Sequence, residues 1–256
     1  MANAGKVVLV GDAVHRPVGP HTATVHALLD HLAHVGFAGS PRVRGYDDAG
    51  RAVLAFVPGD VGLPPYPAWT GTPALLTSVA RLQRALHDAT RSFATPAYAV
   101  WDRTLAPESV VGSGAELIVG HNDLCVENVV VRDGRAVAFI DFDFAAPTDA
   151  LWDVAIAARH WVPTWDPEDL NDGRAGVDQV ARFAAYCDAY GGLDAPARRR
   201  VVDHVLTFLD HALGQVADRA AAGRAGYVEV WAAGYEGRNR RAHAWVTTNQ
   251  DAIAAG

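Results

Sequence analysis

Hydrophobic and polar residues change their spacing several times near the N-terminus of the chain. Four short runs rich in apolar residues read as strands, at residues 7–10, 13–16, 41–46 and 52–57. Gly11-Asp12 separates the first two runs and suits the tight turn of a hairpin. From Val25 to Val35 the apolar residues recur three and four positions apart, which predicts a helix that ends near Gly36. The pattern therefore predicts a small sheet with one helix.

The composition then changes, and most of the remaining chain has helical spacing. Residues 58–73 are rich in Gly and Pro and indicate a hinge and linker. A helix is expected from Leu75 to His87, and beyond Trp152 the spacing is helical almost to the end. Breaks are expected at residues 163–176, 191–192 and 223–226. We therefore divide the chain into a small N-terminal β lobe (1–57), a hinge and linker (58–73) and a mainly helical C-terminal lobe (74–256).

One polar motif interrupts this pattern. It is the run His121-Asn-Asp-Leu-Cys-Val-Glu-Asn128, and Asp141 follows it. A short strand at 116–119 is expected to lead into the motif, and a second hairpin is expected over 129–140. The motif should therefore lie on a loop between strands, with Asp141 at the end of the second hairpin.

The spacing His-x-Asp-x-x-x-x-Asn is one with which phosphoryl-transfer enzymes place a carboxylate beside an attacking hydroxyl and an amide on Mg²⁺. Such a transfer depends mainly on position and charge, because its transition state is loose. Asn128 and Asp141 carry the oxygen ligands that Mg²⁺ prefers. Asp123 would accept a hydrogen bond from the acceptor hydroxyl, orient it and take its proton. These residues predict a kinase-type site in which Asp123 is catalytic and Asn128 and Asp141 hold the metal.

Three neighbouring residues are assigned supporting parts. His121 is expected to brace the motif loop. Asp143 could be a second metal ligand or could cap a turn, and the sequence leaves both open. Asp153 is expected to cap the start of a helix rather than to contact a substrate. The whole motif could also be structural, because His and Asp often satisfy backbone groups, but its position between strands favours a site.

The chain resembles the aminoglycoside phosphotransferase and choline kinase group, relatives of the protein kinases. Three segments carry the resemblance: Gly120-His-Asn-Asp-Leu-Cys-Val-Glu-Asn, Phe-Ile-Asp141-Phe-Asp and Asp149-Ala-Leu-Trp-Asp. It implies an α+β, two-lobed protein-kinase-like fold, ATP or GTP as phosphoryl donor, Mg²⁺, and an alcohol acceptor held by the C-terminal lobe. Upstream, the segment that ends Phe56-Val57-Pro-Gly resembles the hinge of these enzymes, which implies that the backbone of Phe56 and Val57 meets the nucleotide base.

The small lobe departs from the pattern of that group. Lys6 is the only lysine and precedes the first strand, so the best match to the family's phosphate-gripping Lys is Arg16. The first helix offers only Asp30 as an acidic partner for it, and no Gly-rich loop precedes the first strand. Asn122 stands where the family pattern has Gly. The N-terminal lobe therefore looks trimmed.

Composition argues against several other classes of protein. The formal net charge of −7 disfavours nucleic acid as a partner, because phosphate backbones need clustered Lys and Arg. Acidic residues predominate over 101–172, which would draw cations, although such stretches are more often solvated surface. Cys125 and Cys187 are too few for a disulfide framework, and no apolar run approaches the roughly 18 residues of a membrane span. We expect a cytoplasmic monomer or homodimer without a membrane or nucleic-acid partner.

Three hypotheses about function follow. The first is a small-molecule phosphotransferase that moves the γ-phosphate of ATP or GTP to a hydroxyl of a small cationic acceptor, such as an aminoglycoside-like antibiotic, and so gives antibiotic resistance. The second is a catalytically weak or inactive kinase-like binding or immunity protein that sequesters a ligand, because parts that order the triphosphate are missing. The third is a metal-dependent hydrolase whose direct ligands are His121, Asp123, Asp141 and Asp143. The intact motif loop favours the first.

Overall fold

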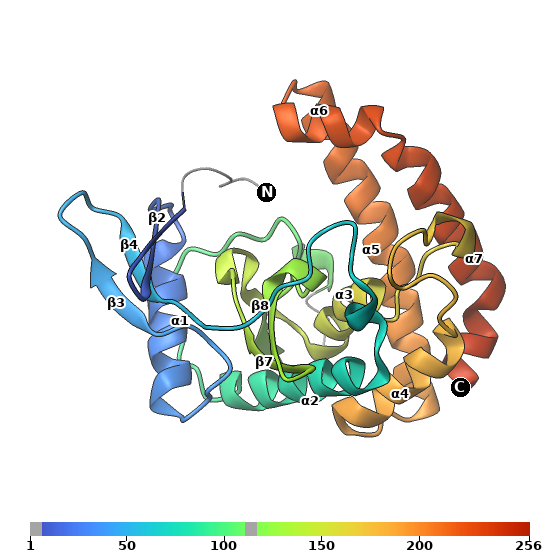
Figure 1. Ribbon diagram of the computed structural model, residues 1–256, viewed down its shortest axis with the longest axis horizontal. Helices are drawn as coiled ribbons and strands as arrows, with labels where there is room; N and C mark the ends of the chain where they lie inside the picture. Colours follow the sequence, from blue (N-terminus) through green and yellow to red (C-terminus); the bar gives the residue numbers. More distant parts are fainter. Residues whose placement is uncertain (1–6, 111–116) are drawn as a thin grey trace.

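The computed structural model describes residues 7–110 and 117–256 and shows a small β lobe beside a larger helical lobe (Figure 1). The chain has an α+β, two-lobed kinase-like fold with a small antiparallel sheet at its N-terminal end. This confirms the fold class expected from the sequence. Two residues named in the sequence analysis lie outside the described residues: Lys6, and Glu116, which begins the strand predicted at 116–119.

The small lobe is a four-stranded antiparallel sheet with one helix against it. Its strands are β1 (Val8–Val10), β2 (Ala13–Arg16), β3 (Val43–Tyr46) and β4 (Ala52–Ala55), in the spatial order β1-β2-β4-β3. Gly11 has a φ of 61° and closes the first hairpin in a conformation that glycine adopts freely. Helix α1 (Thr22–His34) buries Leu28, Leu29 and Leu32 and contacts β3. The four strands and the helix predicted here are confirmed.

The hinge ties the two lobes together through the backbone. Strand β4 ends at Ala55, two residues before the predicted end, although the Phe56 N–H still donates to the Asp12 carbonyl at 2.8 Å. Two hydrogen bonds of 2.8 Å then join Asp60 to Val131 in the large lobe, one in each direction. The chain therefore enters the large lobe along a strand of the second hairpin.

Six helices make up most of the large lobe: α2 (Pro73–Thr90), α3 (Ala150–Trp161), α4 (Gln179–Gly191), α5 (Ala195–Ala221), α6 (Ala225–Ala232) and α7 (Tyr235–Ala255). Figure 1 shows α2 and α4 along one edge, α5 and α7 side by side, and α6 beyond the end of α5. The rings of Trp152 and Trp161 are almost fully buried. The aromatic rings of α3 therefore fill the core, where removing water from their surface stabilises the lobe.

The breaks between these helices were largely predictable. Gly192 has a φ of 73° and its N–H bonds the carbonyls of Cys187 and Asp188, which closes α4 in the usual left-handed way. The predicted break at 163–176 falls between α3 and α4, whereas the break predicted at 223–226 ends early, because α6 already begins at Ala225. Gly234, with a φ of 84°, separates α6 from α7 and was not predicted as a break.

Two antiparallel ribbons carry the motif. Strand β5 (Leu117–Gly120) pairs with β8 (Ala146–Asp149), and β6 (Val129–Arg132) pairs with β7 (Arg135–Phe139). The β6–β7 hairpin was predicted, but β8 was missed because Pro147 interrupts a very short strand. Helix α3 follows β8 at once, and Asp149 caps it by accepting from the Leu151 N–H at 2.8 Å. The prediction that Asp153 caps this helix is therefore wrong.

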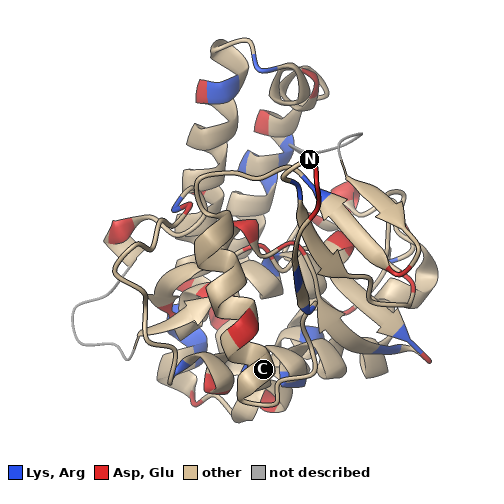
Figure 2. Ribbon diagram, turned by 90° about the vertical axis from the view of Figure 1, so that its left-hand side faces the viewer, with Lys and Arg blue, Asp and Glu red and all other residues tan. Residues whose placement is uncertain are grey.

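Charged residues are interspersed over both lobes in the view of Figure 2. Many of them pair with each other, as Arg44 does with Asp12 and Arg241 with Asp169, each at 2.6 Å. Exposed pairs of this kind contribute little to stability, because water screens them. Within the described part of the chain, no helix is both long and apolar enough to cross a membrane.

Candidate active site

The motif loop leaves β5 through a tight turn made by Asn122. This residue has a φ of 60°, in the left-handed region that Asn tolerates better than most side chains. Its buried amide donates to the carbonyls of Gly120, Phe144 and Ala146 at 3.2, 3.1 and 3.3 Å. Asn122 can therefore replace the glycine of the family pattern, because it makes the same turn and also ties the ends of β5 and β8 together.

A buried carboxylate in α3 holds the same turn. Asp153 accepts hydrogen bonds from the Asn122 N–H at 2.5 Å and from Gln83 Nε2 at 2.9 Å, and lies 2.7 Å from His87 Nε2. Burial opposes ionisation of this carboxyl, but the hydrogen bonds and charge of its neighbours hold the pKa of Asp153 below its usual value. Asp153 therefore positions the motif loop from the core.

Two tyrosines of α4 complete this buried network. The Tyr186 hydroxyl donates to Gln83 Oε1, and the Tyr190 hydroxyl lies near His87 Nδ1, both at 2.7 Å. Sequence analysis missed these partners of Asp153. One signal was present: Gln83 and His87 continue the four-residue spacing of the apolar face of α2, where polar side chains need a partner.

His121 joins the two halves of the site. Its Nε2 lies 2.9 Å from the Ile140 carbonyl, and its ring centroid lies 4.6 Å from that of Phe142. Burial lowers the pKa of His121, so the neutral ring donates to that carbonyl. The motif loop is thereby fixed to the residue before Asp141, which is the geometry that the predicted brace requires.

Asn128 and Asp123 are fixed to each other. Asn128 Nδ2 donates to the Asp123 carbonyl at 2.8 Å and to Asp123 Oδ2 at 2.9 Å. The amide nitrogen is therefore used within the loop. No group of the described residues donates to Asn128 Oδ1, which leaves this oxygen for a cation.

The surroundings of Asp123 favour its protonated form. Burial raises the pKa of Asp123 to about 7, the nearby charge of Asp141 acts in the same direction, and the hydrogen bond from Asn128 opposes both. A carboxyl whose pKa lies near neutrality can both accept and release a proton under ordinary conditions. This property suits the predicted role of Asp123.

Asp141 lies at the turn after β7, with a φ of 63°. Arg16 reaches it from the end of β2: its Nη2 donates to Asp141 Oδ1 at 3.1 Å and also to Asp143 Oδ2. Asp143 therefore forms an ion pair across the two lobes rather than capping a turn. The acidic partners of Arg16 come from the large lobe, whereas Asp30 of α1 is exposed.

A cleft of about 370 Å³ opens between the lobes. Its lining includes every residue predicted to hold metal or nucleotide: Arg16, Phe56, Val57, Asn128 and Asp141. Apolar side chains such as Val14, Leu54 and Ile140 cover the remaining walls, as a flat base requires. Among the described residues, no group accepts from the Val57 N–H, so this donor is available to a ligand at the hinge.

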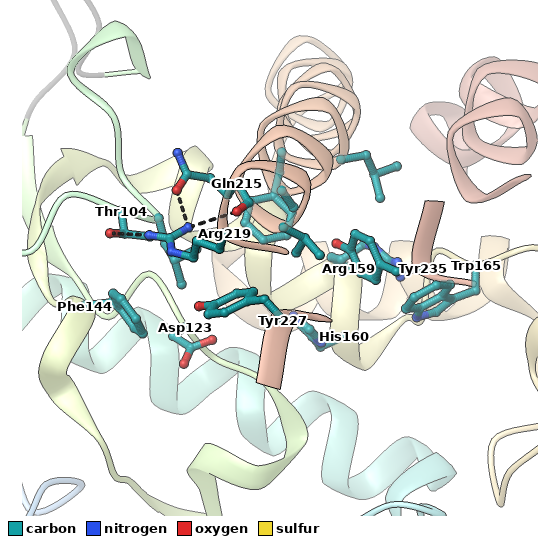
Figure 3. Close-up of a pocket in the computed structure, with 15 residues that line it drawn as sticks. Thr104, Asp123, Phe144, Arg159, His160, Trp165, Gln215, Arg219, Tyr227 and Tyr235 are labelled. Atoms are coloured by element: carbon teal, nitrogen blue, oxygen red, sulfur yellow. Dashed lines mark hydrogen bonds between the residues drawn. The ribbon is translucent and has the colours of Figure 1, made fainter. Parts of the chain in front are cut away.

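Asp123 lines a second cavity, of about 300 Å³, in the large lobe (Figure 3). Figure 3 shows Asp123 and Phe144 near Thr104 and Arg219, with Arg159, Tyr235 and Trp165 farther along the pocket. Asp123 is the only carboxylate among the described lining residues. The charges that line this cavity therefore give no support to the predicted cationic acceptor.

The residues at the cleft suit Mg²⁺, which takes few protein ligands and completes its shell with water and phosphate oxygens. Asn128 Oδ1 is free, and the Asp141 side chain is 50% exposed beside it in the same cleft. In residues 7–110 and 117–256, no three His, Cys, Asp or Glu side chains gather in a way that could hold a metal. His121 and Asp143 are instead engaged with Ile140 and Arg16, which argues against the hydrolase hypothesis.

The two lobes, the motif loop and the cleft define a protein of the kinase-like class. The model of the phosphotransferase enzyme family (APH) matches residues 93–201. A curated relative, the trifolitoxin immunity protein of Rhizobium leguminosarum bv. trifolii, is 33% identical over 217 residues, which cover 82% of this chain and 79% of that protein. The chain belongs to this phosphotransferase family.

Solved structures share the fold at low sequence identity. A choline/ethanolamine kinase family protein from Mesorhizobium loti is 17% identical, with a TM-score of 0.64 over 98% of this chain and 89% of that chain. The GDP complex of aminoglycoside 2'-phosphotransferase-IIIa is 14% identical, with a TM-score of 0.61 over 95% of this chain and 89% of that chain. At these identities the likeness concerns the fold alone.

Proposed function

We propose that the protein transfers the γ-phosphoryl group of ATP or GTP to a hydroxyl of a small molecule. Its family consists of small-molecule kinases that use a nucleoside triphosphate with a divalent metal. One observation carries the proposal: a single braced loop separates two cavities, with Asn128 and Asp141 lining the interlobe cleft and Asp123 lining the other. Donor and acceptor would then meet across this loop.

Each residue of the site has a part in this reaction. Asp123 accepts a hydrogen bond from the acceptor hydroxyl and takes its proton as the new bond forms. Asn128 and Asp141 would hold Mg²⁺, which supplies positive charge to the phosphate oxygens when it is bound. Arg16 adds a guanidinium at the same end of the cleft, and the backbone at Phe56 and Val57 meets the base.

The charges of the pocket beside Asp123 bear on the nature of the acceptor. The sequence suggested a cationic, aminoglycoside-like molecule. The pocket beside Asp123 does not favour that charge, since Arg159 and Arg219 line it and only one carboxylate does. We therefore retain a small hydroxyl-bearing acceptor, with antibiotic inactivation as the proposed role, and drop the requirement for positive charge.

A second candidate function is sequestration without chemistry. Two observations favour it: a relative of 33% identity is named an immunity protein, and Arg16 is already bonded to both Asp141 and Asp143. A protein that only binds its ligand would protect in proportion to its concentration, whereas an enzyme would turn over.

Both candidates are tested by incubating the purified protein with Mg·ATP or Mg·GTP and a panel of amino-sugar, macrolide and peptide antibiotics. Mass spectrometry then measures phosphorylated product. Asp123→Ala should lower turnover by about 10²- to 10⁴-fold while nucleotide binding is kept. Asp48→Ala, at an exposed turn, is the control and should match the wild type.

Equal turnover in Asp123→Ala and the wild type would refute the catalytic role of Asp123. Tight binding of one antibiotic, with no phosphorylated product under any condition, would instead support sequestration.

A further inference from the structure

The charged lining of the pocket beside Asp123 is basic. Its described charged side chains are Asp123, Arg159 and Arg219. His160 also lines the pocket, and burial lowers its pKa to about 3, so this ring is neutral. An acceptor that enters the pocket therefore meets two guanidinium groups and one carboxylate.

Arg159, on α3, is the unusual member of this set. Only 4% of the residue is exposed, and its Nη1 is buried without a hydrogen-bond partner among the described residues. Its guanidinium carbon lies 3.4 Å from the centroid of the Trp165 ring, which covers one of its faces. Burying an ionised group without an opposite charge is costly, so an unpaired guanidinium here calls for a reason.

The other buried arginines of the described chain are satisfied. Arg174 pairs with Asp172 at 2.7 Å. Arg182 donates to three backbone carbonyls, those of Gly71, Trp161 and Val162. Arg159 alone lacks such partners, which indicates that its partner is a ligand.

Arg219, the second arginine that lines the pocket, is held by neutral groups of the protein. It donates to Gln215 Oε1 and to Thr104 Oγ1, as the dashed lines in Figure 3 show. Its donors are therefore partly used, whereas those of Arg159 are not. Of the two arginines, Arg159 is therefore the one whose guanidinium still needs a hydrogen-bonding partner.

The remaining walls of the pocket are largely apolar, and several aromatic rings are among them. Phe144, Trp165, Tyr227 and Tyr235 all line it. Rings of this kind pack well against a flat, largely apolar ligand. The pocket thus combines a planar apolar wall with one proton-accepting carboxylate and one unpaired guanidinium.

We propose that Arg159 binds a carboxylate of the acceptor, and that the pocket takes a molecule with a planar apolar body, a hydroxyl at Asp123 and a carboxylate at Arg159. Arg suits this task because its planar fork can donate two parallel hydrogen bonds to a carboxylate. The hydroxyl end of this inference rests on the proposed function, whereas carboxylate binding requires neither nucleotide nor chemistry.

Three ligands of similar size and different charge test the inference: 4-hydroxyphenylacetate, 4-hydroxyphenylacetamide and tyramine. Binding to the full-length protein without nucleotide is measured by NMR titration. The acid should bind at least about tenfold more tightly than the amine, a difference of about 1.4 kcal/mol, with the neutral amide between them. Arg159→Met should abolish this preference, and Arg81→Met, at an exposed position of α2, should keep it.

A second measurement separates a ligand-binding role from a structural one. If Arg159 is held for a ligand, Arg159→Met should raise the melting temperature of the ligand-free protein, because it removes an unpaired buried charge. A lower melting temperature would assign Arg159 to the core instead and would overturn the inference.

The remaining outcomes are equally decisive. Failure of the acid to bind at millimolar concentration, tyramine binding as tightly as the acid, or a preference that survives Arg159→Met would each overturn the inference. Because these measurements use no nucleotide, a failure of carboxylate binding leaves the proposed phosphoryl transfer untouched. Conversely, a protein that prefers the acid to the amine but does not bind Mg·ATP would reject only the proposed function.

Discussion

Two residues in a left-handed conformation set the orientation of the carboxylates at the candidate site. Asn122 and Asp141 have φ angles of 60° and 63°, values that few side chains other than Asn and Asp adopt readily. The turn at Asn122 sets the position of Asp123, which lines the cavity of the large lobe. The turn at Asp141 brings its own carboxylate to the interlobe cleft. The conformation of the backbone at these turns therefore determines which cavity the carboxylates of Asp123 and Asp141 line.

Asn122→Ala should lower the free energy of unfolding by about 2–4 kcal/mol. It places a Cβ without a polar group in a left-handed conformation and removes three hydrogen bonds to carbonyls. Asn122→Gly keeps the conformational freedom and should cost about 1 kcal/mol less. Urea denaturation measures both variants. An alanine variant as stable as the glycine variant would show that the left-handed turn is not under strain.

The sequence predicted those site residues that belong to a motif of fixed spacing. Asp123, Asn128 and Asp141 were selected because the motif has a fixed length, and the structure places Asp123 at one cavity and Asn128 and Asp141 at the other. The position of Arg159 at the cavity beside Asp123 was not predicted. Its environment depends on how α3 packs against the segment that carries Trp165, and a helical period does not specify that packing.

At the scale of elements, three helices hold one loop. Asp153 of α3 receives hydrogen bonds from α2 and from the motif turn, and Tyr190 of α4 supports the His87 ring behind them. Asp153 Oδ1 accepts from the Asn122 N–H, and Asp153 Oδ2 lies within hydrogen-bond distance of both Gln83 Nε2 and His87 Nε2, so partners fix both carboxylate oxygens. The helical core therefore sets the position of the motif loop.

Asp153→Asn should disrupt this arrangement, although the side chain keeps its size. Each carboxylate oxygen accepts from an N–H, so the amide nitrogen of Asn would face a donor on one side or the other. We expect the free energy of unfolding to fall by about 3 kcal/mol, and turnover to fall with it. Thermal denaturation monitored by circular dichroism measures the first. A variant of wild-type stability would show that Asp153 is not ionised in the folded protein.

The sequence was less informative about these elements than about the motif. It predicted α2 and the helical character of the segment after Trp152 correctly, because apolar periodicity is strong there. It misread Asp153 as a helix cap, since the missed strand β8 ends at Asp149, which caps α3 at its start at Ala150. Contacts between α2, α3 and α4 depend on tertiary packing, which a single sequence does not show.

On the scale of the whole molecule, the lobes are joined by a backbone hinge and by the ion pairs of Arg16. Most of the core lies in the large lobe, where α5 packs against both α3 and α7. His204 of α5 lies at this packing, with its ring centroid 5.6 Å from that of Trp152. Its Nε2 is buried without a partner among the described residues.

Acid should destabilise the protein partly through His204. Burial lowers the pKa of His204, so below about pH 6.5 the unfolded chain binds a proton that the folded protein does not. The neutral His204 ring therefore contributes fully to the free energy of unfolding above that pH. This contribution is lost as the pH falls, by at most about 1.4 kcal/mol per pH unit. His204→Phe keeps the ring contact and removes the titration. Its melting temperature should fall less between pH 7.5 and 5.5 than that of the wild type, and an equal fall would exclude His204 as a source of acid sensitivity.

Isothermal titration calorimetry with Mg·ATP and Mg·GTP tests the assignment of the interlobe cleft most directly. We expect one binding site per chain that requires Mg²⁺, and we expect Asp141→Asn to weaken it by roughly tenfold or more, since the substitution changes one of the two proposed protein ligands of the metal. A folded wild-type protein that binds neither nucleotide at millimolar concentration would contradict the assignment of this cleft to a phosphoryl donor.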